Sequence, residues 1–272
     1  MSATFEQWLE FVFDNPVRER EWYWDEDFYS RWEALELTDA VIVQHMTRLF
    51  LEPGALEPYS LDQIEQGLWF LLGESSPGCP SKALIRRQAA LPDRVACIHA
   101  MSSFFRNFIL AVAPGYFDPE GPAIAVACVA YMWWDIFPMQ SYLLSHLPGP
   151  GRADALLSIV EKWKLGAELH EAVLKEMADE LDLEIETEIH QATLRVMSEI
   201  LDLPSETCQF SALHGLGHWH AQHPEQVEQL WMRSLRGTRI SGLMCSSMPP
   251  GPALAVYSRP SGLRHLSGRR ER

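Results

Sequence analysis

Apolar residues recur every three or four positions along most of this chain, which is the spacing that one face of an α-helix requires. The first runs begin directly after residues that cap helices, namely Thr4, Thr38 and Ser60, and Gln63 stands where it can complete a capping box with Ser60. Alternating apolar runs bounded by Asn-Gly or Asp-Gly turns, the usual sign of β-hairpins, are missing. The sequence therefore predicts an all-α fold.

Turn-forming residues divide the predicted helices into regions, and the clearest break is Pro148-Gly149-Pro150-Gly151. We expect an N-terminal helical region over 1–147, acidic at first and then apolar, and helical hairpins over 152–236. A tail over 237–272 is rich in Ser, Gly, Pro and Arg, and we expect it to be disordered or loosely docked. Beyond the capped helices, the expected helices span about 93–112, 123–134, 153–181, 185–202, 205–222 and 225–236.

The charge distribution argues against one class of function. A formal net charge of −15 and an isoelectric point near 5.1 do not suit a nucleic-acid binder that neutralises phosphates. The negative charge concentrates in two blocks, with 16 acids against 4 bases over 1–75 and 14 against 4 over 153–206. Either these acids are the solvated outer faces of helices, or they form an acidic surface that steers a basic partner.

Signals for export or membrane insertion are missing from the sequence. The first residues form an amphipathic stretch with Glu6 and Glu10 rather than a basic segment followed by an apolar one. The candidate for a membrane span, Gly121 to Trp134, is an uncharged stretch of 14 residues, which is too short to cross a bilayer. The cysteines share no metal-ligand spacing, so we expect reduced thiols in a cytoplasmic protein. They are Cys79, Cys97, Cys128, Cys208 and Cys245.

A helix bearing Ala-Leu-x-Gly-Leu-Gly, a short turn and Pro224 at the start of a second helix occur in order within 205–236. This arrangement resembles the closing hairpin of bacterial HEAT/armadillo-type helical repeat proteins. The resemblance implies an α-solenoid-like array of helical hairpins and a scaffold that binds other macromolecules. Gly215 and Gly217 would let a neighbouring helix approach closely, at a helix-propensity cost of roughly 1 kcal/mol each.

A pair of histidines offers the most direct route to metal or acid-base chemistry. His214 and His218 lie four positions apart, so they share one face of a helix as metal-ligating pairs do. The His-Glu-x-x-His pattern of zinc proteases is missing, because His170-Glu171 lacks the second histidine. Three interpretations stay open: histidines buried at a helix interface, weak metal ligands, or a catalytic base. We expect no cofactor.

Aromatic and acidic side chains are interleaved near the N-terminus. Such a mixture is suited to gripping a cationic ligand or an Arg/Lys-rich peptide by cation–π contact and charge attraction. The same pattern also fits a segment whose rings pin it to the core while its acids face water. The candidate partner-binding residues are Trp22, Tyr23, Trp24, Asp25, Glu26, Asp27 and Trp32.

A second aromatic group contains the adjacent tryptophans Trp133 and Trp134. Because neighbouring residues of a helix point in different directions, both cannot face one core, and we expect one to lie in a groove or at an interface between helices. Asp135 would be costly to bury without a partner, and Arg106 is a candidate partner. Trp133, Trp134 and Asp135 are therefore a candidate ligand pocket.

Signature motifs of common enzyme classes are missing from the chain, including the phosphate-binding loop, the dinucleotide fingerprint and the nucleophile elbow. The leading hypothesis is a non-enzymatic module that binds a protein partner, expected to be basic, and an immunity- or antitoxin-like neutraliser is one form of it. The alternative is an enzyme or ligand-binding protein with a pocket near Trp133 and Trp134 and a metal site at His214 and His218. Nucleic acid and membranes are not expected partners.

Overall fold

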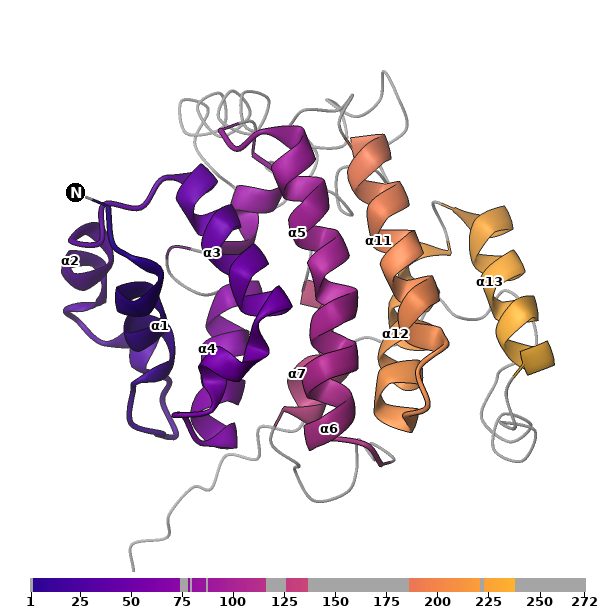
Figure 1. Cartoon of the computed structure of the whole chain (residues 1–272), viewed down its shortest axis with the longest axis horizontal. Coiled ribbons are helices and arrows are strands. Elements are labelled where there is room, and N and C mark those ends of the chain that lie inside the picture. Colours follow the sequence, from indigo (N-terminus) through magenta and orange to yellow (C-terminus); the bar gives the residue numbers. More distant parts are fainter. Residues whose placement is uncertain are drawn as a thin grey trace, which may run out of the picture. The chain divides into compact units, whose positions relative to one another are not determined.

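The computed structural model (Figure 1) describes residues 2–73, 78, 80–86, 88–115, 126–136, 186–220 and 223–237. Helices take up 75% of the described part and none of it lies in a strand, which confirms the all-α prediction. One compact unit runs from Met1 to Ser234, and a second, from Leu235 to Arg272, enters the described part only through the end of one helix. The tail predicted over 237–272 lies outside the described residues, apart from Gly237.

Three helices of the N-terminal region begin directly after the residues that the sequence predicts as caps. The hydroxyl oxygens of Thr4, Thr38 and Ser60 each accept a hydrogen bond from the backbone N–H three residues on. The backbone N–H groups of Thr4 and Ser60 donate in turn to the side-chain oxygens of Gln7 and Gln63, which completes two capping boxes. The helices that start in this way are α1 (Phe5–Phe13), α3 (Asp39–Leu51) and α4 (Leu61–Leu72).

The connector between α1 and α3 is fixed to the core by aromatic rings. It contains the 3-10 turn η1 (Trp22–Trp24) and the short helix α2 (Phe28–Glu33). Phe70 of α4 is fully buried at the centre of this contact, with the surrounding ring centroids 4.9–6.2 Å away. We call these rings the Phe70 cluster, and its other members are Phe11, Trp22, Tyr23, Phe28 and Trp32.

The helix predicted over 93–112 contains a π-helical turn. Pro92 lies in its first turn, as the sequence predicts, and α5 (Leu91–Phe104) passes through the π turn η4 (Phe105–Ile109) into α6 (Leu110–Val112). Figure 1 shows α5 between α3 and α11 (Glu186–Leu201), and it packs against both. The central helix therefore joins the N-terminal region to the second part of the chain.

Helices from both sides of the predicted break share one core. α12 (Glu206–Trp219) packs against α7 (Ala127–Ile136) and α11, and α13 (Pro224–Gly237) begins at the proline expected to start it. The break at 148–151 and the helix predicted over 153–181 lie outside the described residues. The α-solenoid-like arrangement of hairpins stays a prediction.

Gly215 lets α12 lie close against α7. A Cβ atom at Gly215 would overlap the side chain of Trp134, so a larger residue there would push the two helices apart. A Cβ atom at Gly217 would meet nothing within 4 Å. The expectation of a close helix approach is therefore confirmed at Gly215 and wrong at Gly217, which faces open space.

Within the described part of the chain, one helical stretch is long and apolar enough to cross a membrane. It runs from Leu91 to Val112 with a mean hydropathy of 1.5, and 44% of its most apolar window is buried inside the protein. Because a core helix passes the same test of length and composition, this is weak evidence for a membrane span. The expectation that membranes are not partners stays a prediction.

The described cysteines are free thiols packed into the helical core. Cys97 and Cys208 are buried, and Cys128 is partly buried. Burial raises the pKa of Cys97 to about 12, so its thiol stays protonated and unreactive at neutral pH. These three residues therefore act as small hydrophobic side chains, as the sequence suggests.

Candidate functional site

The aromatic residues of the connector divide into buried and exposed ones. Trp22 and Tyr23 are only 1% and 6% exposed and belong to the Phe70 cluster. Trp32 is partly buried in the same cluster. Trp24 and Tyr29 are 40% and 61% exposed. Trp22 and Tyr23 anchor the segment to the core and offer no ring face to a partner. The set of candidate partner-binding residues is therefore smaller than the sequence predicts.

The candidate partner-binding carboxylates of the connector divide into one that forms an ion pair with a described residue and two that do not. The Arg18 guanidinium contacts Asp25, with Nη1 and Oδ2 3.1 Å apart. Glu26 and Asp27 are exposed and form no ion pair with any residue that the structure describes. The exposed surface that remains is called the Trp24 patch below and consists of Trp24, Glu26, Asp27 and Tyr29.

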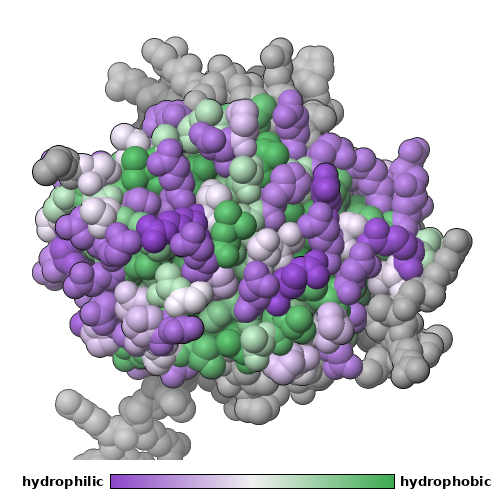
Figure 2. Space-filling model, viewed as in Figure 1, coloured by the Kyte–Doolittle hydropathy of each residue, from purple (hydrophilic) through white to green (hydrophobic). Residues whose placement is uncertain are grey.

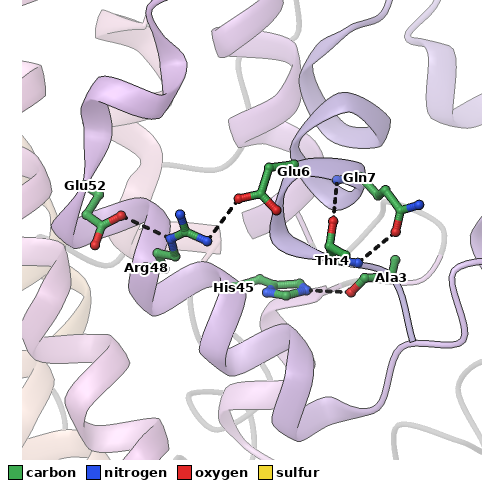
Figure 3. A network of polar contacts seen from close by, with 7 residues as sticks. All are labelled: Ala3, Thr4, Glu6, Gln7, His45, Arg48 and Glu52. Carbon is green, nitrogen blue, oxygen red and sulfur yellow. Dashed lines mark hydrogen bonds and ion pairs between the residues drawn. The ribbon is translucent and has the colours of Figure 1, made fainter. Parts of the chain in front are cut away.

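The arginines of residues 2–73 all contact other groups of the protein, and Arg48 is an example. It bridges Glu6 at 3.2 Å and Glu52 at 3.1 Å (Figure 3). Its guanidinium also lies over the Phe5 ring, 4.1 Å from the centroid. The other arginines of residues 2–73 contact the chain as well: Arg18 at Asp25, Arg20 at the carbonyl oxygen of Trp24, and Arg31 at Asn15 and the ring of Phe11.

The acids of the same region are not balanced by these arginines. On the face shown in Figure 2, hydrophobic surface is scattered among hydrophilic residues. Residues 2–73 contain 15 acids against 4 arginines, so the net charge of this region is negative. The acids that are at least partly exposed and form no ion pair within the described part of the chain are Glu10, Asp14, Glu19, Glu21, Glu26, Asp27, Glu33, Glu57, Asp62 and Glu65.

The adjacent tryptophans of α7 are both buried, Trp133 at 0% and Trp134 at 2% exposure. Trp133 packs against rings of α3, α5 and the π turn, while Trp134 lies at the interface with α12 beside Gly215. Both are covered because α7 has neighbours on two sides. Neither ring is accessible to a ligand, which corrects the candidate pocket at Trp133, Trp134 and Asp135. The Asp135 side chain itself lies outside the described part of the structure.

His214 and His218 lie side by side on α12, as their spacing predicts. Their ring centroids are 4.8 Å apart, and His214 stacks on Tyr131 of α7 at 4.1 Å. Among the described residues, no group of three or more His, Cys, Asp and Glu side chains is placed to hold a metal ion. The stacking on Tyr131 favours the interpretation of His214 as a histidine at a helix interface.

A second histidine pair, which the sequence reasoning missed, joins α11 to the start of α13. His190 Nδ1 and His223 Nε2 lie 3.1 Å apart, and the Trp219 ring packs against both imidazoles, with centroids 4.7 and 5.8 Å away. A hydrogen bond between two imidazoles needs one accepting nitrogen, so at least one ring is neutral. Burial lowers the pKa of His223, which favours this neutral state. Helical spacing rules do not reach across the 33 positions that separate the pair.

Charged side chains are also buried at the start of α3. Asp39 is 7% exposed and lies 3.7 Å from Arg86, while Arg94 of α5 is 1% exposed. Burial raises the pKa of Asp39, and the positive charges of Arg86 and Arg94 oppose that change. Attraction between these charges therefore stabilises the packing of α3 against α5 and against the segment that contains Arg86.

No protein-family model, no curated protein and no solved structure matches this chain. The candidate site therefore rests on the geometry of the Trp24 patch.

Proposed function

We propose that this protein is a non-enzymatic interaction module that binds a basic protein partner through the Trp24 patch. One observation carries the proposal: within residues 24–29, two exposed aromatic rings stand beside two carboxylates that form no ion pair in the described part of the chain. An immunity- or antitoxin-like protein that neutralises a basic partner is one concrete form of this function. The proposed location is the cytoplasm.

The chemistry of the Trp24 patch suits arginine and lysine side chains. Each exposed ring can receive a guanidinium or ammonium group on its face, a contact of about 0.5–1 kcal/mol at an exposed site and about 2 kcal/mol when desolvated. The two carboxylates add charge-assisted hydrogen bonds. Because Trp22 and Tyr23 hold the same segment in the core, the patch is ordered before a partner arrives, which lowers the entropy cost of binding.

The other exposed acids of residues 2–73 support the same proposal. A negative field over the N-terminal region accelerates the approach of a basic partner and makes its association sensitive to salt. The resemblance to HEAT/armadillo-type repeats over 205–236 agrees with a scaffold role, since such repeats bind other macromolecules.

Capture of proteins from the lysate of the native host, at low and moderate salt, tests the proposal. The full chain should retain one stoichiometric basic partner at low salt, and the double variant Trp24→Ala/Tyr29→Ala should retain at least about 10-fold less. Because both rings are exposed, the variant should keep the helical signal in circular dichroism.

Charge variants separate the patch from the general acidity of the chain. Glu26→Gln/Asp27→Asn should weaken capture, whereas Glu206→Gln/Glu225→Gln removes the same charge at exposed positions of α12 and α13 and should leave capture unchanged. Equal capture by the wild-type chain and the Trp24→Ala/Tyr29→Ala variant would remove the patch as the binding site.

A further inference from the structure

A pocket of about 320 Å³ opens between η2 (Pro53–Leu56), the start of α4 and the π turn. Leu61, which is 40% exposed, and the partly buried Phe108 present apolar surface to it, while Leu56 and Ile64, 1% and 2% exposed, lie behind them in the core. Tyr59 also lines the pocket, with its ring centroid 5.7 Å from that of Phe13. Small-molecule sites have volumes of about 300–1,000 Å³, so this pocket accommodates a small ligand.

The π turn supplies one side of the pocket. Its Phe105 and Ile109 are fully buried, whereas Asn107 is exposed and Phe108 is partly buried, and both of these line the pocket. The Phe108 ring stacks on Phe104 at 5.0 Å, which holds it in place. π turns are rare within helices and occur frequently at functional sites. The irregular turn therefore coincides with the pocket.

The mouth of the pocket is acidic. Glu57 lines it, is exposed and forms no ion pair with any described residue. Burial raises the pKa of Tyr59, and the negative charges of Asp14 and Glu10 raise it further. These two carboxylates therefore add negative potential at Tyr59, which lines the pocket. Arg106, the base of the π turn, is not among the residues that line the pocket.

From the apolar walls and the acidic mouth, we propose that this pocket binds a small organic ammonium ion that carries an aromatic or branched aliphatic group. The apolar group lies against Tyr59, Leu61 and Phe108, and the ammonium group lies at the mouth beside Glu57. The same carboxylates reject an anion of equal shape. The site is separate from the Trp24 patch and does not depend on the function proposed for it.

Titration of the full chain with phenethylammonium and with 3-phenylpropionate, followed by backbone NMR, tests the charge preference. The two compounds share a ring and differ in the sign of their charge. Phenethylammonium should bind saturably with shifts at Gly54, Tyr59 and Phe108, and 3-phenylpropionate should bind at least about 10-fold more weakly. Glu57→Gln should weaken the amine by about 10-fold, and Glu33→Gln, an exposed acid of α2, should not. Equal binding of the two compounds overturns the proposal.

Gly54→Leu fills the pocket and is expected to leave the fold intact. A Cβ atom at Gly54 would meet only Glu57 Oε1 at 3.8 Å, an ordinary contact, so the thermal midpoint should stay the same while amine binding is lost. Binding that survives Gly54→Leu overturns the proposal, as does binding of acetyl-Phe-Lys-amide without phenethylammonium, since the occupant would then be a protein segment. Trp24→Ala should leave amine binding unchanged, so the pocket and the Trp24 patch are tested independently of each other.

Discussion

The N-terminal connector and helix α13 are attached to the same core by different forces. The connector is held by the buried rings of the Phe70 cluster. In the described part of α13, Val227 is fully buried, Leu230 and Trp231 are partly buried against the core, and polar contacts make up much of the rest. The polar contacts include the His190–His223 pair at 3.1 Å, the reciprocal Gln191–Gln226 amide pair at 3.3 and 3.0 Å, and the Arg233–Asp202 ion pair at 3.1 Å. Burial of rings responds little to pH and salt, whereas polar contacts respond to both.

Removal of the central ring should have the largest effect. Phe70→Ala should lower the free energy of unfolding by about 3–5 kcal/mol, because it opens a cavity inside the aromatic cluster. Tyr29→Ala, which removes an exposed ring from the same connector, should change it by less than about 0.5 kcal/mol. Urea denaturation measures both values. Equal losses in the two variants would mean that buried rings are not what holds the connector.

The two glycines of α12 form a matched pair, because Gly215 lies at the contact with α7 and Gly217 faces open space. Gly215→Ala should lower the free energy of unfolding by about 1–3 kcal/mol, because its Cβ overlaps Trp134. Gly217→Ala should raise it by up to about 1 kcal/mol, because alanine favours the helix and meets open space. Thermal unfolding compares them, and effects of the same sign would contradict the close approach at Gly215.

Acid should loosen α13 while the connector stays in place. The pKa of His223 is lowered below its ordinary value of 6.5, so the folded state binds fewer protons than the unfolded chain. The stability that the neutral ring contributes is therefore present above pH 6.5 and is lost as the pH falls below that value. Hydrogen exchange of α13 amides should speed up between about pH 7.5 and pH 5.5 relative to the intrinsic rate.

Histidine variants identify the residue responsible for this acid response. The pKa values of His45 and His99 are also lowered by burial, so global stability alone does not distinguish the three. His223→Gln should abolish the pH dependence of α13 exchange, whereas His45→Gln should preserve it. An unchanged acid response in His223→Gln would assign the effect elsewhere.

The smallest expected effect comes from the exposed ion pair of α13. The side chains of Arg233 and Asp202 are 51% and 69% exposed, so Arg233→Gln should cost less than about 1 kcal/mol. The loss should vanish at about 1 M salt, where the screening length is about 3 Å. Exchange of α13 amides at low and high salt measures it, and a loss that persists in high salt would show that Arg233 acts through packing or through its hydrogen bond to the Ser198 carbonyl oxygen, 3.0 Å away.

Local features of this protein follow from the sequence because near neighbours decide them. Thr4, Thr38 and Ser60 cap helices through hydrogen bonds to residues three positions on, and Pro224 starts α13. The candidate site was only partly predictable. Trp22 and Trp24 share the same chemistry two positions apart, yet they are 1% and 40% exposed, because only Trp22 reaches Phe70.

The sequence by itself therefore determined the all-α class, the capped helix starts and the acidity of the N-terminal region. The tertiary structure alone decided that Gly215 rather than Gly217 faces α7, that both tryptophans of α7 are covered, and that His190 meets His223. The reason is the range of the interactions. A helix makes its hydrogen bonds within four residues, whereas the burial of a side chain depends on which distant element packs across from it.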